Sequence, residues 1–189
     1  KPSTSYEATK YELEKLILCD LNNELDVAVL RPTAVIGAGS ENLVKLSNQL
    51  INSSKIINYI RSSIFGSRPM HLVPVQMVSE ALIHLIFLPF PLSKQVYIVA
   101  ADSDVDNNFQ KVEKLLREAL GIEQRKLPLL PLPQLFLRSL LRLLGRSDYS
   151  LSRNYQTEKL RSTGFQTTSS VSRAVMSFGA SIKKTKLKV

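Results

Sequence analysis

The chain has 189 residues, a formal net charge of +9 and a single cysteine, Cys19. This length suffices for one domain with its own core, and the lone cysteine excludes an internal disulfide framework and a cysteine-rich metal site. No apolar run approaches the ~20 residues that a membrane-spanning helix needs. We expect Cys19 to lie in the core, the lysine-rich end "KKTKLKV" to be solvated, and the protein to occupy a reducing, cytoplasmic compartment.

The first half of the chain alternates helix and strand patterns. Apolar residues at steps of three and four predict a helix over 5–22. The β-branched run "VAVLRPTAVIG" at 27–37 predicts a strand buried on both faces, as in parallel sheets. A helix over 40–53, with Ser40 as its N-cap, and a short strand over 68–75 follow.

The second half continues this alternation. The same signals predict a helix over 75–88, a buried strand over 95–101 and a helix over 107–121 that ends at Gly121. Three further helices are expected over 134–145, 154–164 and 169–184. Strands alternating with helices predict an α/β fold with parallel strands. Only two core strands are convincing, so we interpret the chain as the back half of an α/β protein.

Tyr6 and Lys10 stand one helical turn apart in the first predicted helix, so both side chains lie on one face. A lysine ammonium beside a phenol favours the phenolate and lowers the phenol's pKa from its usual ~10. Such a tyrosine can exchange a proton with a sugar hydroxyl while hydride moves at the same carbon. The spacing alone does not identify a site. It also occurs at Tyr11 with Lys15 and at Tyr155 with Lys159.

The surroundings of the first pair distinguish it. "PSTSYEATKYELEKLI" followed by "VAVLRPTAVIGAG" closely resembles the extended short-chain dehydrogenases/reductases, the NAD-dependent nucleotide-sugar epimerases and dehydratases. In that family P-x-x-x-Y-x-x-S/T-K-x-x-x-E precedes a helix and a strand ending in "LRPxxVYGPG". Tyr6, Lys10 and Glu14 are in step with this pattern, and Arg31 and Pro32 follow at the usual distance. Neither other pair precedes such a strand at that distance.

The resemblance covers almost the whole chain and implies a fold and an activity. The fold is the C-terminal part of a Rossmann-type doubly wound sheet plus a small mixed α/β substrate-binding lobe. The activity is that of an NAD(P)-dependent nucleotide-sugar epimerase or 4-ketoreductase, similar to UDP-glucose 4-epimerase, acting on a UDP-sugar in surface-polysaccharide synthesis. Residues 1–37 and 74–101 would belong to the Rossmann domain, and 38–73 and 102–189 to the substrate-binding lobe.

The resemblance also implies roles for single residues. Tyr6 is expected to act as general acid/base at C4 of the sugar, with Lys10 favouring its phenolate and binding the nicotinamide ribose. The expected cofactor-binding residues are Tyr6, Lys10, Pro32, Thr33 and Val35. The expected contacts to the diphosphate or nucleoside are Asn42, Arg68 and Arg153. For Arg153, a solvated helix position is the alternative.

Near the expected substrate site, the chain departs from the family pattern. The position of the family arginine holds Met70, and since alternate strand residues share a face, we expect Arg68 to supply the same contact. Where the family has His-Val-Asp-Asp, the chain has "PVQM", so the following helix loses its acidic N-terminal residues. The usual tyrosine of "VYG" is Ile36.

The family's glycine-rich phosphate-binding turn has no counterpart among the seven glycines of this sequence. The "GAG" at 37–39 ends a strand and begins no dinucleotide-binding unit. The family's catalytic Ser or Thr, which precedes the tyrosine, also has no counterpart. We therefore expect a fragment that lacks the main cofactor-binding half and is inactive as given, while the full-length enzyme forms a homodimer through the helix of Tyr6 and Lys10.

Two other functions stay open. A non-catalytic binding or scaffold protein of the same fold is compatible with the altered "VPVQM" segment. A peripheral membrane protein is compatible with Arg138, Arg142 and Arg146, which recur every four residues among leucines, although we expect these arginines to be a solvated helix face. Neither membrane association nor nucleic acid is expected, the latter because no zinc-finger, RNP or arginine-rich pattern accompanies the charge. No metal site is expected either.

Overall fold

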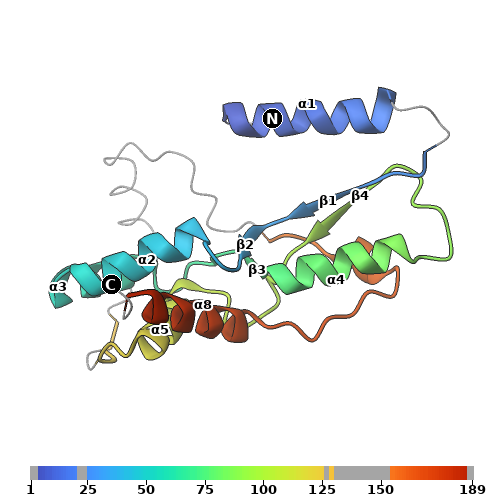
Figure 1. Cartoon of the computed structure of the whole chain (residues 1–189). Helices are drawn as coiled ribbons and strands as arrows, with labels where there is room; N and C mark the ends of the chain where they lie inside the picture. The colour runs from blue at the N-terminus through green and yellow to red at the C-terminus, as the bar shows by residue number, and fades with distance from the viewer. Residues whose placement is uncertain (1–3, 21–24, 126–127, 130–153, 187–189) are drawn as a thin grey trace.

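The computed structural model describes residues 4–20, 25–125, 128–129 and 154–186. Figure 1 shows helices around two short pairs of parallel strands, with the N-terminal helix standing apart from the rest. The described elements are α1 (Ser5–Lys15), the π-helix η1 (Leu16–Asp20), β1 (Ala28–Pro32), β2 (Ala34–Ile36), α2 (Glu41–Asn52), α3 (Lys55–Phe65), β3 (Leu72–Pro74), α4 (Val75–Ile86), β4 (Gln95–Val99), α5 (Phe109–Leu120), α7 (Glu158–Arg161) and α8 (Val171–Lys186). The predicted mixed α/β fold with parallel strands is confirmed, while the helix expected over 134–145 lies outside the described residues.

The strand predicted over 27–37 is two strands that meet at Thr33. β1 pairs in parallel with β4, and β2 pairs in parallel with β3. The Thr33 N–H donates to the Val99 carbonyl (3.0 Å), whereas the next N–H, that of Ala34, donates to the His71 carbonyl (3.0 Å). Successive N–H groups of a strand point to opposite edges, so β4 and β3 lie on opposite sides of this run. The run therefore changes its partner strand at Thr33.

One edge of β1 has no partner strand within the described part of the chain. Because the Thr33 N–H points to β4, the N–H and C=O groups of Ala28 and Leu30 point to the other edge. Unpaired backbone groups at a sheet edge are a template for a further strand. A wider sheet can continue from this edge of β1.

The helices α5 and α8 pack closely in the main core. A Cβ atom on Gly179 would lie 2.5 Å from the Cβ of Ala119, so only a glycine permits this approach of α8 to α5. Asn108 caps the start of α5 by accepting the Lys111 N–H (3.0 Å), and Gly121 ends it in the left-handed region (φ 72°), as predicted. The largest fully buried apolar side chains around these helices and the strands are Ile36, Leu43, Leu72, Leu116, Leu160, Val73, Val99, Val112, Val171 and Val175.

The sequence patterns do not predict α3. The helix begins after Ser54, whose side chain accepts the Ile57 N–H (3.3 Å). Its outer surface carries Ile56, Ile57 and Ile60, which are all more than half exposed. Isoleucine is a weaker helix former than the straight-chain residues. In addition, the exposed face of α3 is apolar, so the sequence lacks the contrast between a polar and an apolar face by which a surface helix is recognised.

The expectation that Cys19 lies in the core is wrong. Cys19 is exposed, and α1 has no buried residue. Leu13 and Leu16 are about half exposed as well. Among the described elements none covers the side of α1 that turns away from the sheet (Figure 1), so these apolar side chains remain at the surface.

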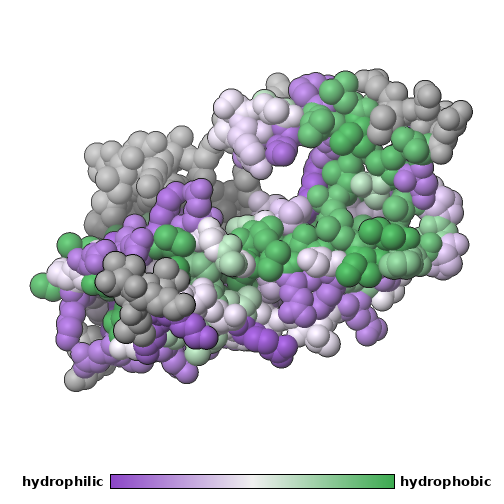
Figure 2. Space-filling model, in the orientation of Figure 1, coloured by the Kyte–Doolittle hydropathy of each residue, from purple (hydrophilic) through white to green (hydrophobic). Residues whose placement is uncertain are grey.

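A second apolar surface follows the outer side of α4. Figure 2 shows apolar residues gathered over this helix and the loop after it. The exposed side chains are Leu82, Ile83, Ile86, Phe87 and Phe90. Contiguous apolar surface of this kind is typical of a face that contacts another molecule.

Asn107→Ala is expected to lower the free energy of unfolding by about 3 kcal/mol. The buried Asn107 side chain accepts the Leu72 N–H (2.9 Å) and donates to the carbonyls of Leu72 (2.8 Å) and Ala101 (2.9 Å), so the substitution leaves buried backbone groups unpaired. Urea unfolding followed by circular dichroism measures the change. The control is Asn52→Ala, at an exposed position in the last turn of α2. Equal losses in the two variants contradict this account.

Candidate active site

A cavity of about 1040 Å³ lies between the inner side of α1 and the run formed by β1 and β2. Figure 2 shows its opening as a gap between α1 and the body of the molecule. All five residues predicted to be catalytic or to bind the cofactor line this one cavity. They are Tyr6, Lys10, Pro32, Thr33 and Val35. The structure thus brings together residues from two separate sequence motifs.

Tyr6 and Lys10 lie on neighbouring turns of α1 and both line the cavity. The Lys10 Nζ lies 5.7 Å from the centre of the Tyr6 ring, and Tyr6 is 70% exposed. Thr4 fixes the start of the helix, because its side chain accepts the Glu7 N–H (3.2 Å). Neither the Tyr6 hydroxyl nor the Lys10 ammonium is hydrogen bonded to a residue that the structure describes, so both can reach a ligand.

The two other Tyr and Lys pairs with the same spacing are arranged differently. The Lys15 Nζ lies 5.2 Å from the Tyr11 ring centre, but Lys15 does not line the cavity and pairs with Glu12 instead (3.8 Å). Tyr155 precedes α7, so Tyr155 and Lys159 do not share a helix. Of the three pairs, the first alone places both side chains at the cavity.

Thr33 lines the cavity, and its hydroxyl group is unsatisfied. Its Oγ1 is buried and has no hydrogen-bond partner in the part of the chain that the structure describes. A buried polar atom without a partner destabilises a protein by about 1–3 kcal/mol. Because the Oγ1 atom is shielded from solvent, a ligand in the cavity would reach it only after a rotation of the Thr33 side chain.

The ion pair of Glu14 and Arg31 ties α1 to β1. The Arg31 Nε and Nη2 donate to the two carboxylate oxygens of Glu14 at 2.8 and 2.5 Å, which is a forked arrangement. Hydrogen bonding to the Glu14 carboxylate raises the pKa of Arg31 above its ordinary value. Among the described residues this is the one ion pair that joins α1 to a strand. It holds the helix over the residues that follow Arg31 in the sequence.

Of the predicted substrate residues that the structure describes, neither Asn42 nor Arg68 lines the cavity. Asn42 is exposed in the first turn of α2. Arg68 follows α3 with its guanidinium 5.9 Å from the centre of the Phe65 ring. Arg153 lies outside the described residues. The structure therefore brings together the residues predicted to be catalytic or to bind the cofactor, whereas Asn42 and Arg68 lie apart from them.

Arg68 and Met70 do not share a strand face, so this prediction is wrong. The strand β3 begins only at Leu72, and His71 before it has a positive φ of 52°. The alternation of faces that a regular strand imposes therefore does not extend back to Arg68. A contact of Arg68 with a diphosphate stays a prediction that rests on the resemblance alone.

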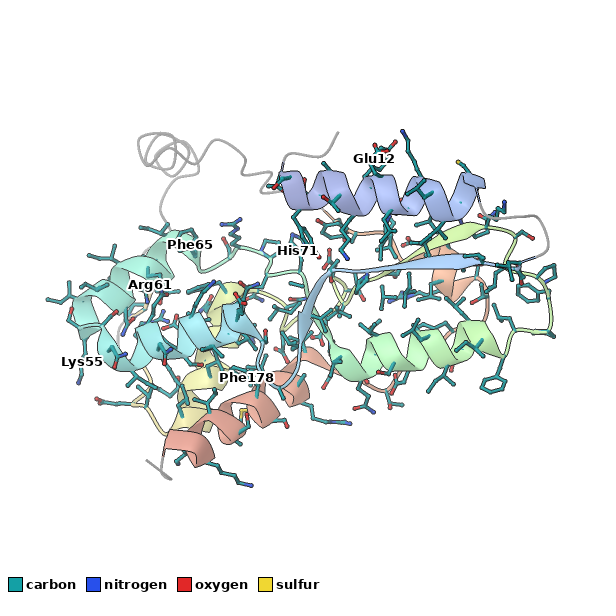
Figure 3. The ribbon with its side chains drawn as sticks, turned by 45° about the horizontal axis from the view of Figure 1, so that its top comes forward. Glu12, Lys55, Arg61, Phe65, His71 and Phe178 are labelled. Carbon is teal, nitrogen blue, oxygen red and sulfur yellow. The ribbon has the colours of Figure 1, made fainter. Side chains whose placement is uncertain are left out.

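The sequence patterns do not reveal a polar cluster around His71. The His71 Nδ1 and the Tyr155 N–H both contact the Asp102 Oδ2, each at 2.9 Å. The Tyr155 ring stands edge-on to the imidazole with the centres 5.1 Å apart. Figure 3 shows His71 on the side of the molecule that faces α1. One signal was present, because Asp102 comes shortly after the carboxyl end of a buried parallel strand, where polar site residues gather.

Glu14→Gln is expected to speed amide hydrogen exchange in α1 about fivefold, because the neutral amide cannot form the charged, forked contact with Arg31. Exchange followed by mass spectrometry measures this effect. Glu12→Gln is the matched control. Figure 3 shows Glu12 on the side of α1 turned away from the sheet, and its partner Lys15 belongs to the same helix. Equal exchange rates in the two variants would mean that Glu14 does not hold the helix.

None of the described helices combines the length and the apolar composition that a membrane crossing requires. The described residues also contain no group of three or more His, Cys, Asp or Glu side chains placed to hold a metal ion. Comparison of the chain with protein-family models, with curated proteins and with solved structures found no match. The function proposed next therefore rests on the residues of the cavity and on the motifs that predicted them.

Proposed function

We propose that this chain supplies the acid/base residues of the active site in an NAD(P)-dependent nucleotide-sugar epimerase or 4-ketoreductase of the extended short-chain dehydrogenase/reductase type. One observation carries the proposal: the five residues predicted from two motifs line a single cavity between α1 and the β1 and β2 run. The proposed substrate is a UDP-sugar, and the proposed setting is surface-polysaccharide synthesis. The catalytic assembly includes protein outside these 189 residues.

The proposed chemistry needs a base at a hydroxyl group and a cation beside that base. The Tyr6 phenolate oxygen takes the proton of the hydroxyl at C4 of the sugar and returns it in the reverse step. The Lys10 ammonium, whose Nζ lies 5.7 Å from the Tyr6 ring centre, is the cation proposed beside that base. A nicotinamide ring, when bound, supplies the acceptor and donor of hydride at the same carbon.

Pro32, Thr33 and Val35 would contact the nicotinamide ring. Pro32 and Val35 offer apolar surface, and Thr33 offers a buried hydroxyl that lacks a partner in the described residues. The sequence contains no glycine-rich phosphate turn, so most contacts to the dinucleotide are proposed to come from outside this chain. The unpaired edge of β1 and the exposed apolar residues of α1 support this view, because a larger sheet with its helices would cover both.

The nucleoside diphosphate end of the substrate belongs, in this proposal, to Asn42, Arg68 and Arg153. Asn42 lies in the first turn of α2, where free backbone N–H groups favour an anion. An arginine such as Arg68 can hold two phosphate oxygens with its forked guanidinium. These contacts would orient the sugar, while Tyr6 and Lys10 would carry out the proton transfer.

Tyr6→Phe and Lys10→Met are expected to lower turnover of a UDP-hexose at least about a hundredfold, since each removes a part of the proton-transfer pair. The protein to assay is the longest native chain that contains these residues. Lys15→Met is the matched control, because Lys15 stands four residues after a tyrosine on the same helix but does not line the cavity. Turnover within about threefold of wild type is expected for this control.

Full turnover in Tyr6→Phe would overturn the acid/base assignment. Binding of NAD(P) without turnover of any UDP-hexose would favour the alternative, a non-catalytic binding protein of the same fold. Failure of the longest native chain to bind either dinucleotide would remove the proposed cofactor altogether.

A further inference from the structure

A second cavity, of about 570 Å³, lies between the C-terminal end of α2, the start of α3 and the C-terminal end of α5. Apolar, cationic and polar side chains line it, together with the acidic Glu123. Leu50, Ile56 and Ile122 form apolar walls beside Arg117 and Arg125. None of these lines the cavity of Tyr6 and Lys10, so a ligand bound here does not depend on the function proposed above.

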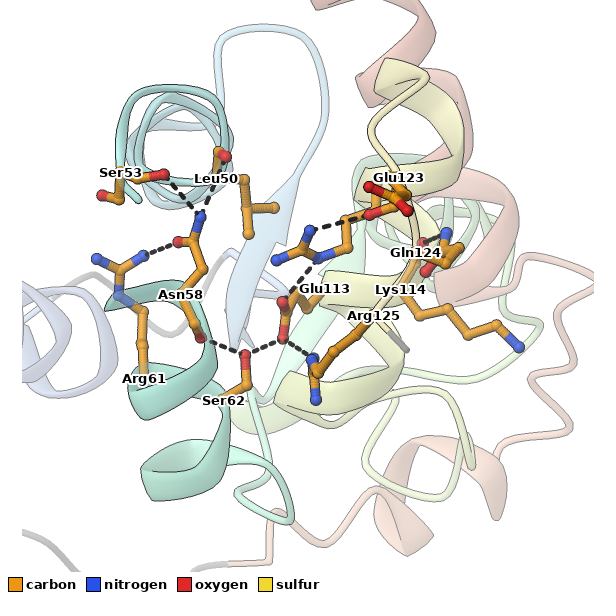
Figure 4. Close-up of polar contacts among 11 residues, drawn as sticks. Leu50, Ser53, Asn58, Arg61, Ser62, Glu113, Lys114, Glu123, Gln124 and Arg125 are labelled. Atoms are coloured by element: carbon orange, nitrogen blue, oxygen red, sulfur yellow. Dashed lines mark hydrogen bonds and ion pairs between the residues drawn. The ribbon is translucent and has the colours of Figure 1, made fainter. Parts of the chain in front are cut away.

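The centre of this region is the carboxylate of Glu113, which is fully buried in α5. Arg117 Nε donates to one of its oxygens (2.8 Å), and Arg125 Nη2 donates to the other (2.6 Å). The Ser62 hydroxyl on α3 also donates to Glu113 (Figure 4). Two guanidinium groups therefore share a single buried carboxylate.

Because two arginines share the one carboxylate of Glu113, this cluster has a net positive charge and more hydrogen-bond donors than the carboxylate can accept. Arg117 Nη1 donates to the Glu123 carbonyl (3.2 Å), and Lys55 pairs with the Glu123 carboxylate at the exposed rim (3.0 Å). Arg125 Nε is buried and has no hydrogen-bond partner within the described part of the chain. A partly buried cation with an unpaired N–H destabilises a protein unless an anion or an acceptor meets it.

The walls of the cavity set a second requirement. Leu50 is buried, and Ile56 and Ile122 add apolar surface beside the two arginines. A small inorganic anion would satisfy the arginines but would leave these apolar walls in contact with water. A ligand with an anionic head and an apolar body satisfies both parts of the lining.

We propose that this cavity binds an amphiphilic anion, a carboxylate or phosphate monoester carried on an apolar body. The head group accepts hydrogen bonds from Arg125 and Arg117, and the apolar body lies against Leu50, Ile56 and Ile122. The excess positive charge of the Glu113 cluster gives the site its preference for anions. The apolar walls give it a preference for heads that carry a hydrocarbon chain.

Isothermal titration calorimetry on the native chain tests this site with four probes: octanoate, octyl phosphate, octanol and inorganic phosphate. At least one of the two amphiphilic anions is expected to bind saturably and about tenfold or more tighter than octanol and inorganic phosphate. Octanoate and octyl phosphate distinguish a carboxylate head from a phosphate head. Octanol binding as tightly as both anions would overturn the proposal, and so would the absence of binding by either anion.

Two substitutions locate the binding. Ile56→Glu places a negative charge on an exposed residue of the lining, and Arg125→Lys keeps the charge but removes the forked N–H groups. Both are expected to weaken binding of the amphiphilic anion about tenfold or more. Ile57→Glu is the matched control, because Ile57 is similarly exposed on α3 but does not line the cavity. Because Ile56 is exposed, Ile56→Glu is expected to fold even if Arg125→Lys disturbs the buried contacts of Glu113. Unchanged affinity in Ile56→Glu would overturn the proposal.

Discussion

The candidate site depends on one electrostatic contact, the forked ion pair between Glu14 on α1 and Arg31 on β1. Helix α1 buries no side chain, so the two charged hydrogen bonds of this pair replace the apolar packing that holds α5 against α8. Arg31 immediately precedes Pro32 and Thr33, and Glu14 follows Lys10 by one helical turn. The contact therefore sets Tyr6 and Lys10 opposite the residues proposed to meet the nicotinamide ring. A helix held in this way opens more readily than one anchored in a core.

The strand side of the site is built in the opposite manner. Thr33 lies where the strand run leaves β4 and joins β3, and its backbone is paired on one side while that of Ala34 is paired on the other. The buried side chain of Asn107 joins these strands, since it bonds to the backbone of Leu72 in β3 and to the carbonyl of Ala101 after β4. Several hydrogen bonds therefore fix the strand junction, whereas α1, which faces it, is held mainly by one ion pair.

The features that could be predicted from the sequence have local causes. The cap residues Asn108 and Gly121 delimit α5, and the motif around Tyr6 and Lys10 selects the pair, among three with equal spacing, whose side chains both line the cavity. The division of the strand at Thr33 could not be predicted, because it depends on which strands lie beside it and not on the run itself. The same holds for Cys19: its apolar helix face is exposed because the described chain provides no element to cover it. The clusters around Asp102 and Glu113 bring in His71, Tyr155 and Ser62 from distant parts of the sequence, and local patterns do not reveal these partners.

The central claim is that the cavity between α1 and β1 receives a nicotinamide ring beside the Tyr6 hydroxyl. The most direct measurement is a crystal structure of the longest native chain that contains these residues, in complex with a nicotinamide dinucleotide and a UDP-hexose. We expect the nicotinamide ring to pack against Pro32 and Val35 and to make a polar contact with Thr33. The sugar hydroxyl is expected within hydrogen-bond distance of Tyr6. A dinucleotide bound elsewhere, or a cavity filled by other side chains of the same protein, would contradict the claim.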